Sequence, residues 1–201
     1  PITDGAFEVH ARPMRTNRST QHWLVELRQG DAVAAFATVL TAVRRDTWSA
    51  TDAVFPSVPS AESLPRHPGV FRTEWPKAYD MRFTDGEQVL DNVVRDDAVT
   101  RVWLRDEPPR PLDFLALSAI CDAFIPRVFV RRSRAVPAGT VTLTVYFHAD
   151  AALLAAQGTA HVLGCAKGLR YSQGFHDQTA EIWSAQGDLL AVGHQVVYFK
   201  E

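Results

Sequence analysis

The chain has 201 residues, and its 21 basic and 23 acidic side chains nearly balance. This length allows one large domain or two small ones with a sizeable buried core. A net charge of −2 without blocks of like charge excludes a general nucleic-acid or polyanion binder.

Targeting and metal signals are absent from the sequence. Charges interrupt every apolar run well before the ~18 residues that a membrane span needs. The first residues do not form a charged-then-apolar signal segment. Cys121 and Cys165 lie in apolar surroundings, and neither they nor the scattered histidines have metal-ligand spacing. We therefore expect a reduced, cytoplasmic protein without a metal or another cofactor.

Period-two patterns of apolar residues predict strands on both sides of a proline-rich connector, which lies between residues 52 and 76. Three strands are expected before the connector and six after it. They cover residues 7–14, 21–28, 32–43, 78–83, 99–104, 140–148, 161–171, 175–184 and 189–199.

One long helix is predicted between Pro111, which opens its first turn together with Asp113, and Pro126, which ends it. Its sequence FLALSAICDAF is apolar or small on every side, and Asp122 is the one charge inside it. A helix of this kind is expected to be wrapped by other structure. One buried helix and many antiparallel strands predict a curved sheet folded about a central helix.

The last strand contains one polar residue in an otherwise apolar row. Alternate residues from Leu189 to Phe199 share one face, and on that face only Gln195 is polar. A carboxamide in a dry row needs hydrogen-bond partners, so we expect a polar group opposite it.

An internal similarity links the two ends of the chain. Residues 25–42 resemble residues 180–199, and the tripeptide Gln-Gly-Asp occurs at a turn in both segments. The offset is too long for a solenoid and suits a duplicated domain. Thr38 then takes the place of Gln195, and the helix of the first copy would precede residue 1. Either the first copy has lost its helix or an N-terminal piece is missing from this chain, and we expect the missing piece.

Three segments carry a family resemblance: LALSAICDAF, GTVTLTVYFH and VGHQVVYFK. They resemble the TesB-like family, the bacterial type II acyl-CoA thioesterases, which have a double hotdog fold. By this resemblance Asp122, Thr140 and Gln195 are the catalytic residues, and Thr140 is located eight positions before His148. Members often carry an Asp-His pair in the middle of the threonine strand, where this chain has Thr142 and Leu143.

The resemblance implies an α+β double hotdog whose first hotdog, residues 1–50, lacks its N-terminal helix. Residues 51–76 would be a linker, and residues 77–201 the second hotdog with the catalytic residues. The implied reaction is hydrolysis of fatty-acyl-CoA to a free acid and coenzyme A, without a cofactor. Hotdog modules associate through sheets, so a homo-oligomer is expected.

In the implied mechanism Asp122 orients a water and takes its proton, while Thr140 and Gln195 fix the angle of attack. The residues support one part independently, because Asp122 and Gln195 both stand in dry positions and each supplies the partner that the other needs. By pattern alone, Asp122 would be a helix residue paired with solvent or an arginine, and Gln195 a core amide bonded to backbone. Thr140 would be an ordinary strand threonine on a wet face shared with Thr142 and Thr144.

Other interpretations stay open. A hotdog that binds acyl-CoA or an acyl chain without hydrolysing it is the main alternative, whereas a hydratase would need a histidine within residues 112–128, which have none. We interpret Cys121 as a core residue. The four arginines at positions 127, 131, 132 and 134 are interpreted as a solvated loop, with coenzyme A phosphates as the alternative ligand.

Overall fold

The structure is a computed structural model that describes residues 2–68, 73–87 and 90–200. The chain divides into two compact units, Pro1–Ala50 and Thr51–Glu201, and each unit is described by itself. Among the described residues no helix has both the length and the apolar character that a membrane crossing requires.

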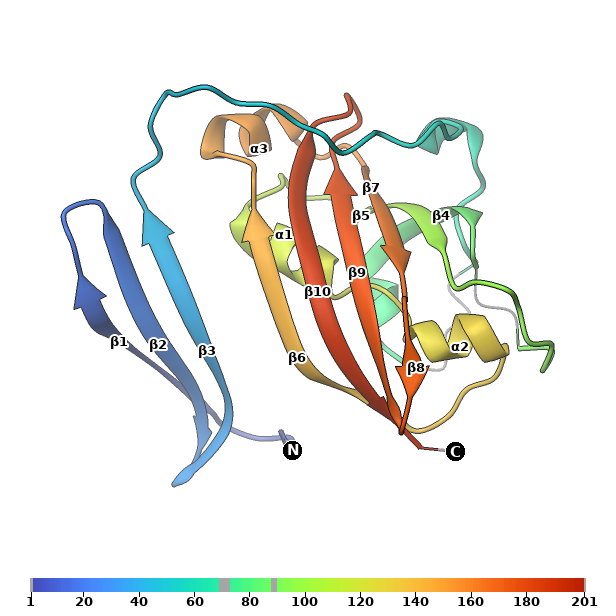
Figure 1. Ribbon diagram of the computed structural model, residues 1–201, viewed down its shortest axis with the longest axis horizontal. Coiled ribbons are helices and arrows are strands. Elements are labelled where there is room, and N and C mark those ends of the chain that lie inside the picture. Colours follow the sequence, from blue (N-terminus) through green and yellow to red (C-terminus); the bar gives the residue numbers. More distant parts are fainter. Residues whose placement is uncertain (1, 69–72, 88–89, 201) are drawn as a thin grey trace. The chain divides into compact units, whose positions relative to one another are not determined.

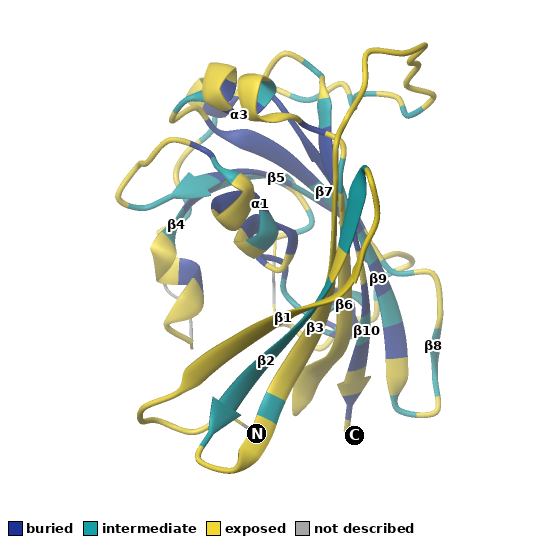
Figure 2. Cartoon of the chain, turned by 90° about the vertical axis from the view of Figure 1, so that its left-hand side faces the viewer, coloured by how far each residue is buried: buried dark blue, intermediate teal, exposed yellow. Residues whose placement is uncertain are grey.

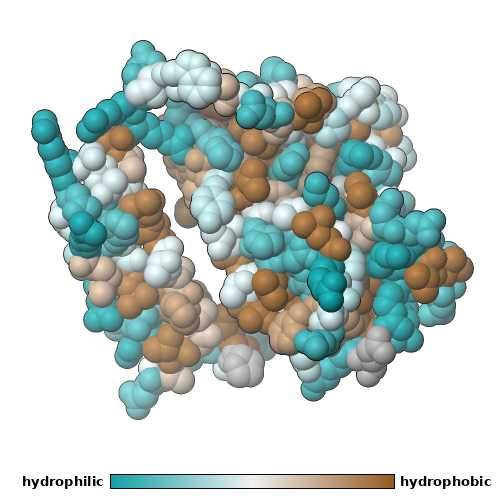
Figure 3. All heavy atoms as spheres, viewed as in Figure 1, coloured by the Kyte–Doolittle hydropathy of each residue, from teal (hydrophilic) through white to brown (hydrophobic). Residues whose placement is uncertain are grey.

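The first unit is an antiparallel meander of three strands: β1 (Glu8–Thr16), β2 (Thr20–Gln29) and β3 (Ala32–Ala42). Gly30 has a φ of 59° in the turn between β2 and β3, a conformation that glycine adopts without a steric penalty. Strands β1 and β3 are almost entirely exposed and are yellow in Figure 2, whereas β2 between them is mostly of intermediate burial and is teal. Apolar residues such as Phe7, Phe36 and Leu40 are exposed. Figure 3 shows brown, hydrophobic side chains at the surface of the molecule. Its described residues include no helix.

The second unit is a seven-stranded antiparallel sheet with helix α1 (Phe114–Cys121) lying against one face (Figure 1). The strand order is β4-β5-β7-β9-β10-β6, and the short β8 pairs with β9. The bounds are β4 Tyr79–Asp85, β5 Thr100–Asp106, β6 Ala138–Phe147, β7 Val162–Lys167, β8 Tyr171–Ser172, β9 Phe175–Trp183 and β10 Leu189–Phe199.

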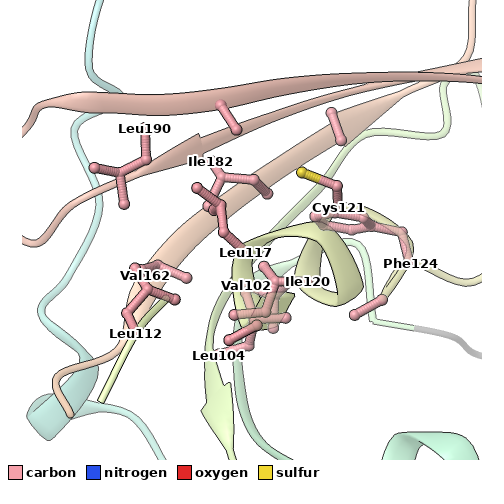
Figure 4. Packing of buried hydrophobic residues seen from close by; sticks show 14 of the residues in the cluster. Val102, Leu104, Leu112, Leu117, Ile120, Cys121, Phe124, Val162, Ile182 and Leu190 are labelled. Atoms are coloured by element: carbon pink, nitrogen blue, oxygen red, sulfur yellow. The ribbon is translucent and has the colours of Figure 1, made fainter. Parts of the chain in front are cut away.

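The main core lies between α1 and the face of the sheet that it covers. Leu117 and Ile120 of the helix pack with Leu104, Ile182 and Leu190 of the strands, and all five are at most 1% exposed (Figure 4). Burying one such side chain contributes roughly 1.5–3 kcal/mol. Packing of one helix face therefore fixes α1 on the sheet.

The opposite face of the sheet is covered by the segment predicted as a linker. Trp103 and Trp183 form a second apolar cluster there, against which Phe55 and Leu64 pack. The Trp103 indole N–H also donates a hydrogen bond of 2.8 Å to the carbonyl oxygen of Pro59. Two short 3-10 turns, Ala61–Ser63 and Trp75–Ala78, interrupt this otherwise irregular segment. Residues 51–68 thus belong structurally to the second unit.

Helix boundaries differ from the sequence expectation. The expected helix ends at Cys121 rather than at Pro126, because the chain turns at Asp122 and a new helix, α2 (Arg127–Arg132), begins after Pro126. A third helix, α3 (Ala151–Gln157), was not predicted, although Asp150 caps it by accepting a bond from the Leu153 N–H. The expected strand 161–171 is divided into β7 and β8.

The expectation that α1 is wrapped on every side is wrong for the described residues. Leu115 is 76% exposed, and Phe114 and Ala119 also reach the surface. Figure 2 shows this as yellow beside dark blue along the helix. Hydrophobic composition records which residues favour burial, but it does not record which side of a helix a neighbour covers.

Candidate active site

The amide of Gln195 and the carboxylate of Asp122 meet in the second unit. Gln195 lies in the buried row of β10 with 3% exposure, and its Nε2 donates a hydrogen bond to Oδ1 of Asp122. Asp122 is the residue at which α1 ends. The contact expected between the helix and the last strand is therefore present.

The expectation that Asp122 and Gln195 both lie in dry positions is correct for Gln195 only. Gln195 is buried, whereas Asp122 is exposed on the wall of a cleft. The sequence predicted Asp122 inside a packed helix, but because α1 ends at Cys121, Asp122 lies in the turn at the end of the helix. One side of the carboxylate thus faces solvent and the other faces Gln195.

A glycine allows the end of α1 to approach β10 closely. Gly193 shares the inward row with Gln195, and a Cβ added to it would lie 3.4 Å from Cβ of Cys121. Any side chain longer than that of alanine would push the helix end outward. Gly193 therefore sets the separation that lets Asp122 and Gln195 touch.

A β-bulge places Thr140 on the same side of the sheet as Gln195. Thr142 pairs with Val196, but Thr140 pairs with Val197, so Val141 is an extra residue in β6. Cross-strand partners share a face, and the extra residue reverses the alternation. Thr140 consequently faces inward while Thr142 faces outward. The sequence interpretation, which put both on one wet face, is wrong at this point because it assumed an unbroken period of two.

These three side chains line one cleft of about 420 Å³. Asp122, Thr140 and Gln195 are among its polar groups, while Trp75 and Phe124 contribute aromatic surface. Thr140 is exposed to the cleft. A concave site with mainly apolar walls and a few convergent polar groups is typical of small-molecule binding.

Opposing effects act on the Asp122 carboxyl. Burial against the protein raises its pKa above the ordinary 3.8, and the hydrogen bond from Gln195 acts in the lowering direction without cancelling the rise. Tyr79, which also lines the cleft, has its pKa raised to about 12 by burial and by the charges of Asp106 and Asp122. Its phenol therefore stays protonated near neutral pH.

Two buried residues continue the hydrogen bonding behind Gln195. Nε2 of Gln178 donates to Oε1 of Gln195 at 2.7 Å, and Nε of Arg127 donates to Oε1 of Gln178 at 3.0 Å. Sequence reasoning missed both. Gln178 pairs directly with Gln195 across β9 and β10, so two facing glutamines in a predicted hairpin were the available signal.

Arg127 overturns the interpretation of the arginine cluster as a solvated loop. It stands at the start of helix α2 and is 0% exposed, so it is also inaccessible to a coenzyme A phosphate. Arg131 and Arg132, by contrast, border a separate cleft of about 750 Å³.

A small cavity of about 50 Å³ lies beside the cleft, and it shares Trp75 and Phe124 with the cleft. Met81 and Phe83 belong to its apolar wall, while Arg127 is among its polar lining residues. Gly164 leaves room for the Phe124 ring, because a Cβ added there would lie 2.6 Å from it.

Cys121 is a core residue as interpreted, since it is 1% exposed and its thiol pKa is raised to about 12 by burial and by the charge of Asp122. Among the described residues no three His, Cys, Asp or Glu side chains are grouped to hold a metal ion.

Comparison with known families decides the relationship. Residues 52–199 match the acyl-CoA thioesterase C-terminal domain, and residues 1–43 match the acyl-CoA thioesterase N-terminal domain. The chain belongs to the TesB-like acyl-CoA thioesterase family. The family predicted from the three sequence segments is thereby confirmed. No curated protein matches this thioesterase-family chain.

Solved structures similar to this thioesterase-family member have the hotdog fold. A conserved hot dog protein of unknown function from Alicyclobacillus acidocaldarius is 46% identical, with a TM-score of 0.92 over 97% of this chain and 73% of that one. The tesB protein of Mycobacterium avium subs paratuberculosis is 18% identical, with a TM-score of 0.75 over 97% and 72%. The acyl-CoA thioesterase II TesB2 of Mycobacterium marinum is 14% identical, with a TM-score of 0.67 over 96% and 73%.

Proposed function

We propose that the protein hydrolyses fatty-acyl-CoA thioesters to a free acid and coenzyme A, with Asp122, Thr140 and Gln195 as catalytic residues. The observation that carries this proposal is the hydrogen bond from Gln195 to Asp122 on the wall of a cleft that Thr140 also lines. Family membership supplies the thioester chemistry. The geometry supplies a base, an amide and a hydroxyl around one solvent-accessible space.

In the proposed reaction a water attacks the thioester carbonyl carbon. Asp122 accepts a proton from that water, the new C–O bond forms, and the C–S bond breaks as the coenzyme A thiolate leaves. The proton then passes from Asp122 to the thiolate sulfur, which regenerates the carboxylate. A raised pKa suits this role, because a base whose pKa approaches the working pH transfers protons most efficiently.

Gln195 and Thr140 serve the attacking water and the developing oxyanion. The amide nitrogen of Gln195 carries two hydrogens, and Asp122 is its one acceptor among the described residues. The second hydrogen is therefore free to bind the water or the thioester oxygen. The hydroxyl of Thr140 faces the same cleft and offers a further donor, which stabilises negative charge on oxygen.

The apolar wall of the small cavity beside the cleft is the proposed site for the end of the acyl chain. This wall includes Met81, Phe83 and Val102, and the cavity meets the cleft at Phe124. Transfer of each methylene from water into such a cavity contributes about 0.8 kcal/mol.

Further parts of the proposal concern organisation. We place the site in the second hotdog, residues 77–201, of a double hotdog whose first hotdog includes residues 1–50. The protein acts as a cytoplasmic homo-oligomer. The exposed apolar residues of the three-stranded sheet support association, because large apolar patches mark interaction surfaces.

Thiol release from acyl-CoAs of increasing chain length tests the proposal. Wild-type protein is expected to release one thiol per acid formed. Asp122→Asn is expected to lose 10²–10⁴-fold in kcat, the usual effect of removing a general base, while keeping its circular dichroism spectrum. Undiminished turnover by the folded variant would remove Asp122 from the mechanism.

A non-catalytic acyl-CoA binder is the second candidate. Thr142 and Leu143 stand where relatives often carry an Asp-His pair, and this departure favours it. Calorimetric binding of acyl-CoA without any free thiol would establish the binder and overturn the hydrolase.

A further inference from the structure

Two buried residues outside the proposed catalytic set require an explanation. Arg127 and Gln178 are 0% and 1% exposed. No carboxylate pairs with the Arg127 guanidinium in the described part of the chain, and burial lowers its pKa to about 10. Burying a cation without a counter-ion is unfavourable unless its hydrogen bonds are satisfied.

The hydrogen bonds of Arg127 are satisfied entirely by neutral acceptors. Nη1 donates to Oγ1 of Thr100 at 2.7 Å and to the Ala98 carbonyl at 3.1 Å, and Nη2 donates to the Ile125 carbonyl at 2.6 Å. Nε is divided between the Ile125 carbonyl and Oε1 of Gln178, at 3.1 and 3.0 Å. The guanidinium is thus held rigidly, with one donor directed at Gln178.

An arginine can only donate hydrogen bonds, and this fixes the direction of every bond that follows. Gln178 must present its carbonyl oxygen to Arg127, which leaves its Nε2 to face Gln195. Gln195 must then present its own carbonyl oxygen to Gln178, and its Nε2 faces Asp122. Each amide has a single orientation that is compatible with its neighbour.

We propose that Arg127 and Gln178 are positioning residues, which hold the Gln195 amide so that an N–H rather than a carbonyl oxygen faces Asp122. An amide turned by 180° would direct a carbonyl oxygen at the carboxylate, and two acceptors repel each other. It would also remove the second N–H from the attacking water. The inference rests on the proposed function for its effect on catalysis, whereas the orientation itself is independent of any activity.

The chain allows the bond direction to be tested without changing side-chain size. In Gln178→Glu the new carboxylate still accepts a hydrogen bond from Arg127. Because it has no N–H, it can no longer donate to Gln195 and can only accept a hydrogen bond from it. The Gln195 amide must therefore turn and present its oxygen to Asp122. Loss of the donor raises the pKa of Asp122. We expect the acidic limb of the kcat/KM profile to move up by at least about one pH unit, because a nearby charge shifts a carboxyl pKa by about 1–3 units and loss of the hydrogen bond acts in the same direction.

Two further variants, Gln178→Met and Gln157→Glu, are compared with Gln178→Glu. Gln178→Met removes the donor to Gln195 without adding charge, so a smaller shift in the same direction is expected. Gln157, at the end of α3, is a third buried glutamine in the described part of the chain, and it donates to the carbonyls of Ala160 and His161 in the loop after the helix. Gln157→Glu introduces an equivalent buried carboxylate away from the site, so its pH profile should match the wild type even where its stability is lower.

The pKa of Asp122, measured by NMR on protein labelled at the aspartate carboxyl, separates the two proposals. A higher Asp122 pKa in both Gln178 variants supports the positioning role even when wild-type protein proves inactive, which would refute only the hydrolase. An Asp122 pKa and acidic limb unchanged in folded Gln178→Glu would overturn the positioning role, and so would an equal shift in Gln157→Glu.

Discussion

Thr140→Val tests whether the bulge in β6 matters for chemistry. The exchange replaces a hydroxyl that faces the cleft by a methyl group of similar size. Thr140 is exposed and its hydroxyl makes no hydrogen bond within the described structure, so unfolding free energy should change by at most about 0.5 kcal/mol. Loss of one donor to a developing oxyanion typically lowers kcat 10²–10³-fold, or ~2.7–4 kcal/mol.

Thr142→Val is the matched control, because the bulge at Val141 turns Thr142 to the opposite face of the same strand. Both variants have the same composition change and the same strand propensity. Thiol release should fall for Thr140→Val alone, with urea midpoints within error of the wild type for both. Equal losses in the two variants, or none in either, would refute the assignment of Thr140 to the site.

Three further predictions follow from the site. Gly193→Val places branched atoms against Cys121, so the end of α1 should shift and activity should fall, with an overpacking loss of about 1–3 kcal/mol in unfolding free energy; an unchanged crystal structure and rate would contradict this. Because the folded protein binds the Asp122 proton more tightly than the unfolded chain, wild-type stability should fall relative to Asp122→Asn as pH rises from about 3.8 through the raised pKa. Urea titrations of both proteins across that pH range measure their unfolding free energies. The stability of Asp122→Asn relative to the wild type should grow as pH rises, and a relative stability that falls would contradict the prediction. A Cys121 thiol with a pKa of about 12 should resist iodoacetamide at pH 8, and mass spectrometry should find it unmodified while activity persists; rapid alkylation of the folded protein would show that the thiol is accessible.

The period of the apolar residues and the positions of the prolines predicted most of the strands and helices of the second unit. Strand β10 begins and ends at the expected residues, 189 and 199. The polar residue in its apolar row correctly indicated a partner, because an unsatisfied buried amide is unfavourable wherever it occurs. The pairing of Gln195 with Asp122 was therefore predictable from local chemistry together with the family resemblance.

Features that depend on three-dimensional register were not predictable. A bulge shifts the face of Thr140 by one residue, and no residue between Gly139 and Thr142 signals it. Arg127 was interpreted as solvated since arginines usually are, whereas here neutral acceptors from Ala98, Thr100 and Ile125 surround it. Ile125 is two residues from Arg127, but Ala98 and Thr100 are 29 and 27 residues away and reach it only in the folded unit.

The central claim is that Asp122 activates a water and does not itself attack the thioester. A single turnover with enzyme in excess over acyl-CoA, run in H₂¹⁸O, tests this claim directly. Attack by an activated water should place one ¹⁸O atom in the released acid and none in the peptide that contains Asp122. Unlabelled acid together with ¹⁸O in that peptide would instead show attack by the carboxylate.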